Sequence, residues 1–277
     1  DSNVVPVGVE LTPDGQYALI SVENRSDLYA LDLVNHSIRI VELTGDPSDM
    51  AVVDSTDTTV FVFGNGSAVD VLEHTLFDIE TYTLDEPMTD ISKGEDFAIL
   101  YNTNGYHDCY FLDLVEGDLV EYRLQNPAVS VHLAPTEDFA IALTRPESGY
   151  GGDAIDAMPG MEIIDLINEK NSTFVLEGQG VGVAYSSDET SLHALLLQEG
   201  AEYVYKYNLY TGEQQIIDLS APPVSIGSMP DGNFYITHDN GSGLVSFLNP
   251  DSGELTEVAG FGTLGILDPI QLFEEEE

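Results

Sequence analysis

Apolar residues in this chain occur in short runs, and residues that favour turns separate one run from the next. Some runs are continuously apolar, such as residues 139–143, and others alternate with polar positions, such as residues 37–43. Continuous runs of this length are typical of strands buried on both faces, and alternating runs of strands with one solvated face. Because no long stretch has the spacing of an amphipathic helix, we predict an all-β protein.

The strands are grouped into repeats whose first residue is usually a proline. Four prolines stand 41, 40 and 40 residues apart, at Pro6, Pro47, Pro87 and Pro127. Pro223 follows after 96 further residues and Pro269 after another 46, and the fifth repeat keeps the same short strand at residues 181–185 without a proline. A period of about forty residues is typical of propellers and solenoids.

Each repeat contains four candidate strands. A small, apolar first strand is followed by a turn such as Pro-Asp-Gly at residues 13–15 and then by a second strand that begins with an aromatic residue. The third strand ends in an acidic or amide residue, a hairpin follows, and the fourth strand is more polar. This order predicts a β-propeller of four-stranded antiparallel blades. We expect the inner strands to be buried and the outermost strand to carry the charges.

The repeats predict one propeller domain over residues 1–273, followed by an acidic tail at 274–277. Six complete blades are expected, and the start of a seventh at residues 263–273 favours a seven-bladed ring whose missing strands come from outside this chain. A six-bladed ring is the alternative. The predicted blade limits are approximately 6–46, 47–86, 87–127, 128–179, 180–222 and 223–262.

Residues 13–33 and 230–254 carry the repeat in its fullest form. They combine Pro-Asp-Gly-x-Tyr/Phe, a third strand ending in a motif such as Leu-Asp-Leu at 31–33, and a hairpin that contains glycine at 251–254. This combination resembles the YVTN-type β-propellers, a group of bacterial and archaeal exported or surface proteins. A WD40 propeller is not expected, because the chain has no tryptophan.

The resemblance implies a periplasmic, secreted or cell-surface protein that binds or scaffolds another protein, a glycan or a component of the cell envelope. Two alternatives stay open. Lactonase-like propeller enzymes share this general pattern and would need a channel-bound metal, whereas a structural subunit of a larger surface assembly would take strands from a neighbour.

The charge of the chain restricts its partners. Fifty acidic residues stand against seven basic ones, which gives a formal net charge of −43. Such a field repels nucleic acid and anionic membrane surfaces, so any partner is expected to be cationic. Since no apolar stretch reaches about 18 residues, membrane insertion is not expected. The charge is consistent with a high-salt environment, with a surface that recruits cations, or with a highly soluble exported protein.

The fourth repeat departs from the others by an insertion of 17 residues at positions 144–160. Long insertions on a rigid scaffold often carry binding residues, and here the candidates are Arg145, Tyr150, Asp153 and Asp156. Asp153 and Asp156 are also candidate Ca²⁺ ligands, because carboxylates and backbone carbonyls suit this ion. No EF-hand spacing is present, and no other cofactor is predicted. The alternative is a tolerated, solvated loop.

No catalytic motif is visible, and no catalytic residue is predicted. Asp49, Asp90 and His132 lie on predicted first strands and are candidates for a central channel, where the lactonase-like alternative would place a metal beside Asp90 and His132. Cys109 is the sole cysteine, so no intramolecular disulfide is possible, and we expect a packed, inert thiol.

Five Asn-x-Ser/Thr sequences are candidate glycosylation sites, and all lie in predicted turns. Asn, Gly and Ser also gather in turns for conformational reasons, which is the alternative explanation. The candidate residues are Asn24, Asn35, Asn65, Asn171 and Asn240.

Overall fold

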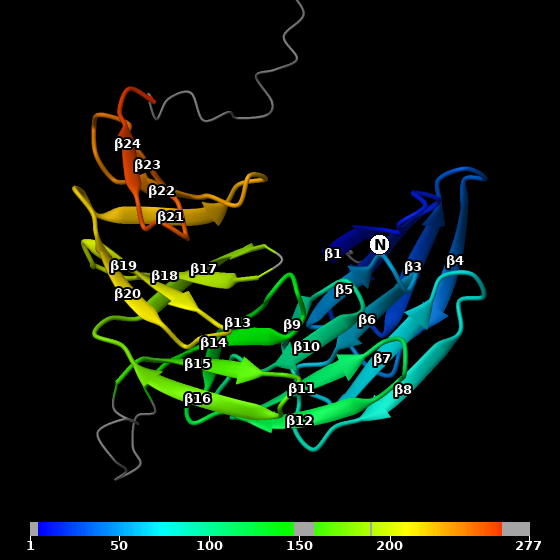
Figure 1. The fold of residues 1–277 in the computed structure, drawn as a ribbon. Helices are drawn as coiled ribbons and strands as arrows, with labels where there is room; N and C mark the ends of the chain where they lie inside the picture. Colours follow the sequence, from blue (N-terminus) through cyan, green and yellow to red (C-terminus); the bar gives the residue numbers. More distant parts are fainter. Residues whose placement is uncertain (1–4, 147–157, 189, 262–277) are drawn as a thin grey trace, which may run out of the picture. The chain divides into compact units, whose positions relative to one another are not determined.

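The computed structural model describes residues 5–146, 158–188 and 190–261, and within these ranges it contains 24 strands and no helix (Figure 1). The strands form six four-stranded antiparallel sheets, in each of which the strands follow one another in chain order. We call the sheets blades one to six. No helix in the described ranges is long and apolar enough to cross a membrane.

Each blade lies within one predicted repeat. The strands of blades one to three are β1 (Pro6–Leu11), β2 (Tyr17–Val22), β3 (Asp27–Asp32), β4 (Ser37–Glu42), β5 (Asp49–Val53), β6 (Thr58–Val62), β7 (Ala68–Glu73), β8 (Ile79–Thr83), β9 (Asp90–Lys93), β10 (Phe97–Tyr101), β11 (Asp108–Asp113) and β12 (Leu119–Arg123). Those of blades four to six are β13 (Ala128–Leu133), β14 (Phe139–Thr144), β15 (Gly160–Asp165), β16 (Lys170–Val175), β17 (Gly180–Ser187), β18 (Leu192–Gln198), β19 (Tyr203–Asn208), β20 (Gln214–Asp218), β21 (Pro223–Ser228), β22 (Phe234–His238), β23 (Val245–Leu248) and β24 (Leu255–Val258).

The blades belong to two compact units. The N-terminal unit, Asp1–Val175, contains blades one to four, and the C-terminal unit, Leu176–Glu277, contains blades five and six. The expected start of a seventh repeat at 263–273 and the acidic tail at 274–277 lie outside the described residues.

The Pro-Asp-Gly turns fold as their chemistry predicts. In blade one, Gly15 has a φ of +66°, and Asp14 Oδ1 accepts a hydrogen bond from the backbone nitrogen of Gln16 at 2.8 Å. Glycine has no Cβ to oppose this left-handed conformation, and aspartate stabilises the turn through its own backbone. In blade six, Asp231 accepts the equivalent bond at 3.1 Å.

The acidic or amide residue at the end of each third strand stabilises the hairpin that follows. Asp32 Oδ1 accepts hydrogen bonds from the backbone nitrogens of Val34 and Asn35 at 2.9 and 2.7 Å. The same kind of bond is made by Glu73, Asp113, Asp165, Asn208 and Asn249. The recurring residue in the sequence is therefore explained by local hydrogen bonding.

Second strands, and not first strands, form the centre of the core. All residues of β6 and β18 are buried, whereas five of the six residues of β1 are exposed. Our expectation of buried inner strands is therefore wrong for β1. One face of blade one packs Leu19 and Leu28 against Phe61 and Leu72 of blade two, but β1 itself lies at the edge of its sheet.

The other face of blade one is apolar and open. The strand register places Val9 with Ile40, and Leu11 with Ile38, on the same side of the sheet. Their exposed fractions are 58%, 60%, 56% and 65%, respectively. We call these four residues the open face of blade one. Exposed apolar groups gathered on one sheet face are characteristic of a surface that contacts another protein.

Neighbouring first strands of the N-terminal unit are joined by side chains. Asp49 Oδ2 accepts a hydrogen bond from the backbone nitrogen of Ile91 at 2.9 Å, and Lys93 Nζ donates to the carbonyl of Val52 at 2.7 Å. These bonds fix blades two and three against each other.

Candidate binding site

The connection between one blade and the next has a regular form. A leucine follows the fourth strand, and the backbone N–H of the next residue donates to the side chain of a third-strand residue in the following blade. In the part of the chain that the structure describes, such bonds run from Thr44 to Asp70 (2.7 Å), from Asp85 to Tyr110 (3.1 Å) and from Gln125 to Glu162 (2.6 Å).

The two carboxylates in this series are completely buried and well supplied with donors. Asp70 also accepts from the hydroxyls of Thr44 and Thr81 at 2.8 and 2.7 Å. Glu162 also accepts from Asn171 Nδ2 at 3.2 Å, and its burial raises its pKa. Because a buried charge is costly without donors, these bonds make the carboxylates stabilising parts of the blade seams.

Blade five departs from this pattern. The backbone N–H of Gly178 donates at 3.0 Å to Oε1 of Gln198, which ends the second strand and not the third. Gln198 is 3% exposed, and its Nε2 has no hydrogen-bond partner.

Blade six shows the same position with every polar atom paired. His238 is the last residue of β22, and Gln198 is the last residue of β18. Two residues before His238, β22 pairs with Ser246 of the third strand, and two residues before Gln198, β18 pairs with Tyr205 of the third strand. His238 Nδ1 lies 2.8 Å from the carbonyl of Ala221, and Nε2 lies 2.7 Å from Ser246 Oγ. Blade five has a tyrosine where blade six has this serine.

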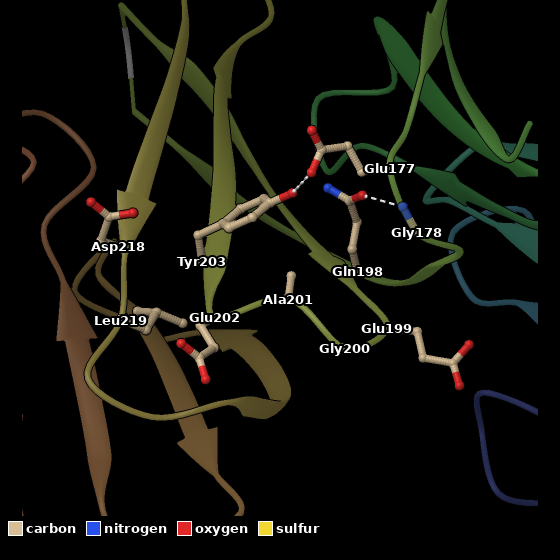
Figure 2. A pocket seen from close by; sticks show the side chains of 10 residues that line it. All are labelled: Glu177, Gly178, Gln198, Glu199, Gly200, Ala201, Glu202, Tyr203, Asp218 and Leu219. Atoms are coloured by element: carbon tan, nitrogen blue, oxygen red, sulfur yellow. Dashed lines mark hydrogen bonds between the residues drawn. The ribbon is translucent and has the colours of Figure 1, made fainter.

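A hollow of about 640 Å³ lies beside Gln198 (Figure 2). We call it the acidic hollow, because the described residues that line it include four carboxylates and no lysine, arginine or histidine: Glu177, Glu199, Glu202 and Asp218. All four residues are exposed. Its lining also includes Gln198 and Tyr203.

Three separate segments build the acidic hollow. Glu177 belongs to the connection after β16, residues 199–202 form the turn between β18, which ends at Gln198, and β19, and Asp218 ends β20. Gly200 allows the turn, with a φ of +73°. Tyr203 donates its hydroxyl to Glu177 Oε2 at 3.0 Å, and burial together with the neighbouring Tyr205 and Glu177 raises the pKa of Tyr203, which keeps the hydroxyl protonated.

The residues predicted from the insertion of blade four are only partly described. Arg145 follows β14, and its backbone nitrogen donates to the carbonyl of Pro127 at 3.1 Å. Tyr150, Asp153 and Asp156 lie outside the described residues, so their binding and Ca²⁺ roles stay predictions. Within the described ranges, no three His, Cys, Asp or Glu side chains are arranged to hold a metal ion.

Two of the three channel candidates lie near each other. Burial raises the pKa of Asp49, and the charge of Asp90 adds to the shift. Burial also raises the pKa of Tyr101 to about 12, again with a contribution from Asp90. His132 lies on β13, where burial lowers its pKa and its Nε2 lies 3.0 Å from Ser130 Oγ. The backbone bonds of Asp49 give this carboxylate a structural role.

The candidate glycosylation residues are at least partly exposed, and four of the five lie in turns or bends as predicted, whereas the prediction of a turn is wrong for Asn171, which pairs within strand β16. Asn24, Asn35, Asn65 and Asn171 are exposed, and Asn240 is half-buried. The side chain of Asn171 already donates to Glu162 at the seam of blades three and four. Cys109 is 1% exposed, as expected for a packed thiol, and burial raises its pKa.

Neither a protein-family model nor a curated protein sequence matches the chain. Solved structures do match the chain, at low sequence identity. Dihydro-heme d1 dehydrogenase NirN in complex with DHE is 13% identical with a TM-score of 0.61, over 92% of this chain and 57% of that one. Hydrazine synthase from Kuenenia stuttgartiensis is 14% identical with a TM-score of 0.54, over 89% of this chain and 77% of that one.

The chain has the β-propeller fold. The fold class predicted from the sequence is therefore confirmed. At these identities the likeness concerns the fold alone, and a fold shared so widely hosts many unrelated functions.

The acidic hollow was not predicted from the sequence. Its residues come from a connection, a turn and two strand ends, and each of these segments is unremarkable by itself. One feature of the sequence could have indicated it. The apolar strand at residues 192–198 ends in the amide residue Gln198, and no turn motif in the sequence explains this polar residue.

Proposed function

We propose that this protein is a non-enzymatic, extracytoplasmic binding module related to the YVTN-type propellers, and that it binds a cationic protein at the acidic hollow of blade five. The observation that carries the proposal is a hollow of about 640 Å³ whose described lining has four carboxylates and no basic side chain. A volume of this size suits a small ligand or a side chain that projects from a partner.

Electrostatics supports a cationic partner. The net charge of −43 attracts positively charged proteins at long range and accelerates their encounter. The hollow then adds a concave surface lined by several carboxylates. The carboxylates of the lining can attract a cationic group, and its amide and hydroxyl groups can form hydrogen bonds with the ligand. The extracytoplasmic location is supported by the resemblance of residues 13–33 and 230–254 to exported propellers and by the acidic composition.

The proposal is tested with two double variants of equal net charge. Glu177→Gln/Glu202→Gln changes the hollow, and Glu213→Gln/Glu254→Gln changes two exposed carboxylates of the same unit outside it. Binding of a fluorescent peptide of alternating lysine and alanine is measured by anisotropy at ionic strengths on either side of about 0.1 M, where the Debye length is about 10 Å. We expect the hollow variant to bind about tenfold more weakly and the control to stay within about twofold. Equal losses in the two variants would mean diffuse attraction to the net charge and would overturn the proposal.

A second role is favoured by the open face of blade one. A structural subunit would cover Val9, Leu11, Ile38 and Ile40 with another chain, since exposed apolar patches commonly mark interfaces. Light scattering of the isolated chain tests this role. We expect an oligomer that Ile40→Lys dissociates, and a chain that is monomeric at every concentration contradicts it.

A further inference from the structure

We infer that the acidic hollow takes a lysine side chain together with a backbone carbonyl of the same ligand residue. The ammonium group is held by Glu177 in the negative potential of the other lining carboxylates, and the carbonyl accepts a hydrogen bond from Nε2 of Gln198. This inference rests on the proposed function and gives the chemistry of its ligand.

The orientation of the Gln198 amide is fixed by the backbone. Gly178 N–H donates to Oε1 at 3.0 Å, and a rotated amide would place two N–H donors against each other. Nε2 is therefore directed away from Gly178, and Figure 2 shows it on the side where Tyr203 and Glu177 lie. The side chain is 3% exposed and Nε2 has no partner, so an acceptor carried by a ligand removes the cost of this unmade bond.

Blade six shows that this arrangement is particular to blade five. The residue in the same position, His238, contacts the connection through Nδ1 and Ser246 through Nε2. In blade five, Oε1 of Gln198 likewise contacts the connection at Gly178, but Nε2 of Gln198 has no partner among the described residues and can bind a ligand.

The charge of the lining decides the other half of the ligand. Because Glu177, Glu199, Glu202 and Asp218 all line the hollow, without a basic side chain among its described residues, its potential is negative, and an ammonium group compensates this charge where a neutral ligand would not. The described residues do not bring three such groups together with metal-binding geometry, which favours an organic cation over a metal ion. The ammonium of lysine can bind Glu177 through any of its three diverging N–H donors, whereas the planar guanidinium of arginine needs a carboxylate aligned with its own plane.

In this binding mode Tyr203 controls access to the amide. Its hydroxyl donates to Glu177 Oε2 at 3.0 Å, and Nε2 of Gln198 is covered in the free protein. An ammonium that binds Glu177 competes with this hydroxyl. Once the hydroxyl is released, the tyrosine side chain is free to turn away and admit the ligand carbonyl to Nε2.

Two probes separate the carbonyl from the ammonium. Nα-acetyl-L-lysine N-methylamide carries both groups, and butylammonium carries the ammonium alone. Dissociation constants for the whole chain are measured by NMR titration. We expect the lysine probe to bind about 3- to 10-fold more tightly than butylammonium, the range given by one hydrogen bond.

The variant Gln198→Glu removes the N–H donor and keeps an acceptor for Gly178. We expect the preference for the lysine probe to fall to about onefold, because the lost donor is the group that recognises the carbonyl. Gln215→Glu makes the same charge change at an exposed glutamine outside the hollow and should keep the full preference. An unchanged preference in Gln198→Glu overturns the inference and leaves the proposed function standing, whereas equal losses of peptide binding in the two double variants remove both.

A second variant serves if Gln198→Glu does not fold. Tyr203→Phe removes the hydroxyl that competes for Glu177 and keeps the aromatic ring. We expect both probes to bind about twofold to fivefold more tightly, in proportion to the loss of a weak surface hydrogen bond. Weaker binding of both probes contradicts the competition between tyrosine and ammonium.

Discussion

The seams of the N-terminal unit and the acidic hollow of the C-terminal unit use the same kind of group in opposite ways. At the seams, Asp70 and Glu162 are completely buried, and backbone and side-chain donors surround each carboxylate. At the hollow, the carboxylates are exposed and the buried polar group, the amide of Gln198, lacks one partner. The difference shows that donor supply decides whether an acidic residue stabilises the fold or stays available for a ligand.

Three of the basic residues also lie at contacts between blades. Lys206 Nζ donates to the carbonyl of Pro250 at 2.5 Å and links blade five to blade six. Arg39 lies 4.6 Å from the centre of the Phe77 ring and links blade one to blade two. Together with Lys93, these cations connect neighbouring blades, and none of them lines the acidic hollow.

The largest expected effect is the loss of stability when a buried carboxylate at a blade seam is removed. Asp70→Ala removes the acceptor of the Thr44 backbone N–H and of two threonine hydroxyls in a buried place. We expect the free energy of unfolding to fall by about 3 kcal/mol. Denaturant unfolding followed by tyrosine fluorescence measures it. Asp218→Ala in the hollow is the matched substitution and should change it by less than about 0.5 kcal/mol; similar losses would show that the hollow is also structural.

A smaller effect compares the equivalent residues of blades five and six. His238→Leu breaks contacts to both Ala221 and Ser246, and Gln198→Leu breaks the contact to Gly178 alone. We expect losses of about 2 and about 1 kcal/mol, about one increment for each hydrogen bond removed. Thermal unfolding of the two variants tests the order, and a greater loss in Gln198→Leu would imply that Nε2 has a partner in the folded protein.

The smallest effect concerns pH and has opposite signs at two aspartates. Burial raises the folded-state pKa of Asp49, so its charged form is disfavoured and the wild type gains stability as the pH falls through that pKa. Hydrogen bonds from Thr12 and Gln16 lower the pKa of Asp14, so its contribution is present at neutral pH and is lost as the pH falls through the lowered pKa.

The Asn variants at these two positions make the signs measurable. At neutral pH, Asp49→Asn should be at least as stable as the wild type, whereas Asp14→Asn should be less stable. Both differences should shrink as the pH falls. Melting temperatures recorded between neutral and acidic pH test this, and the same sign for both variants would contradict the assignment of burial at Asp49 and of hydrogen bonding at Asp14.

The fold could be predicted because each blade repeats local signals. Prolines mark first strands, Pro-Asp-Gly marks the first turn, and the residue that ends the third strand, such as Asp32, makes hydrogen bonds within its own hairpin. All these interactions join residues close in sequence, so spacing alone reveals them. The exposure of β1 could not be predicted in this way, because an apolar pattern records the residue and not the neighbour that covers it.

The acidic hollow depends on contacts that spacing does not reveal. Gly178 and Gln198 meet because β17 and β18 pair in one register, and a shift of one residue would turn the amide to the other face. The insertion of blade four attracted the binding prediction by its length, but three of its four candidate residues lie outside the described ranges. Length indicates where a loop is tolerated, and chemistry indicates where a ligand is held.

The buried thiol of Cys109 gives the N-terminal unit its own kinetic reporter. It is the sole cysteine of the chain, and at 1% exposure it pairs with Tyr122 across β11 and β12. A thiol reagent can reach it only when blade three opens, so the labelling rate measures the frequency of that opening without any mutation. Ligands of the acidic hollow should leave this rate unchanged unless the two units open together.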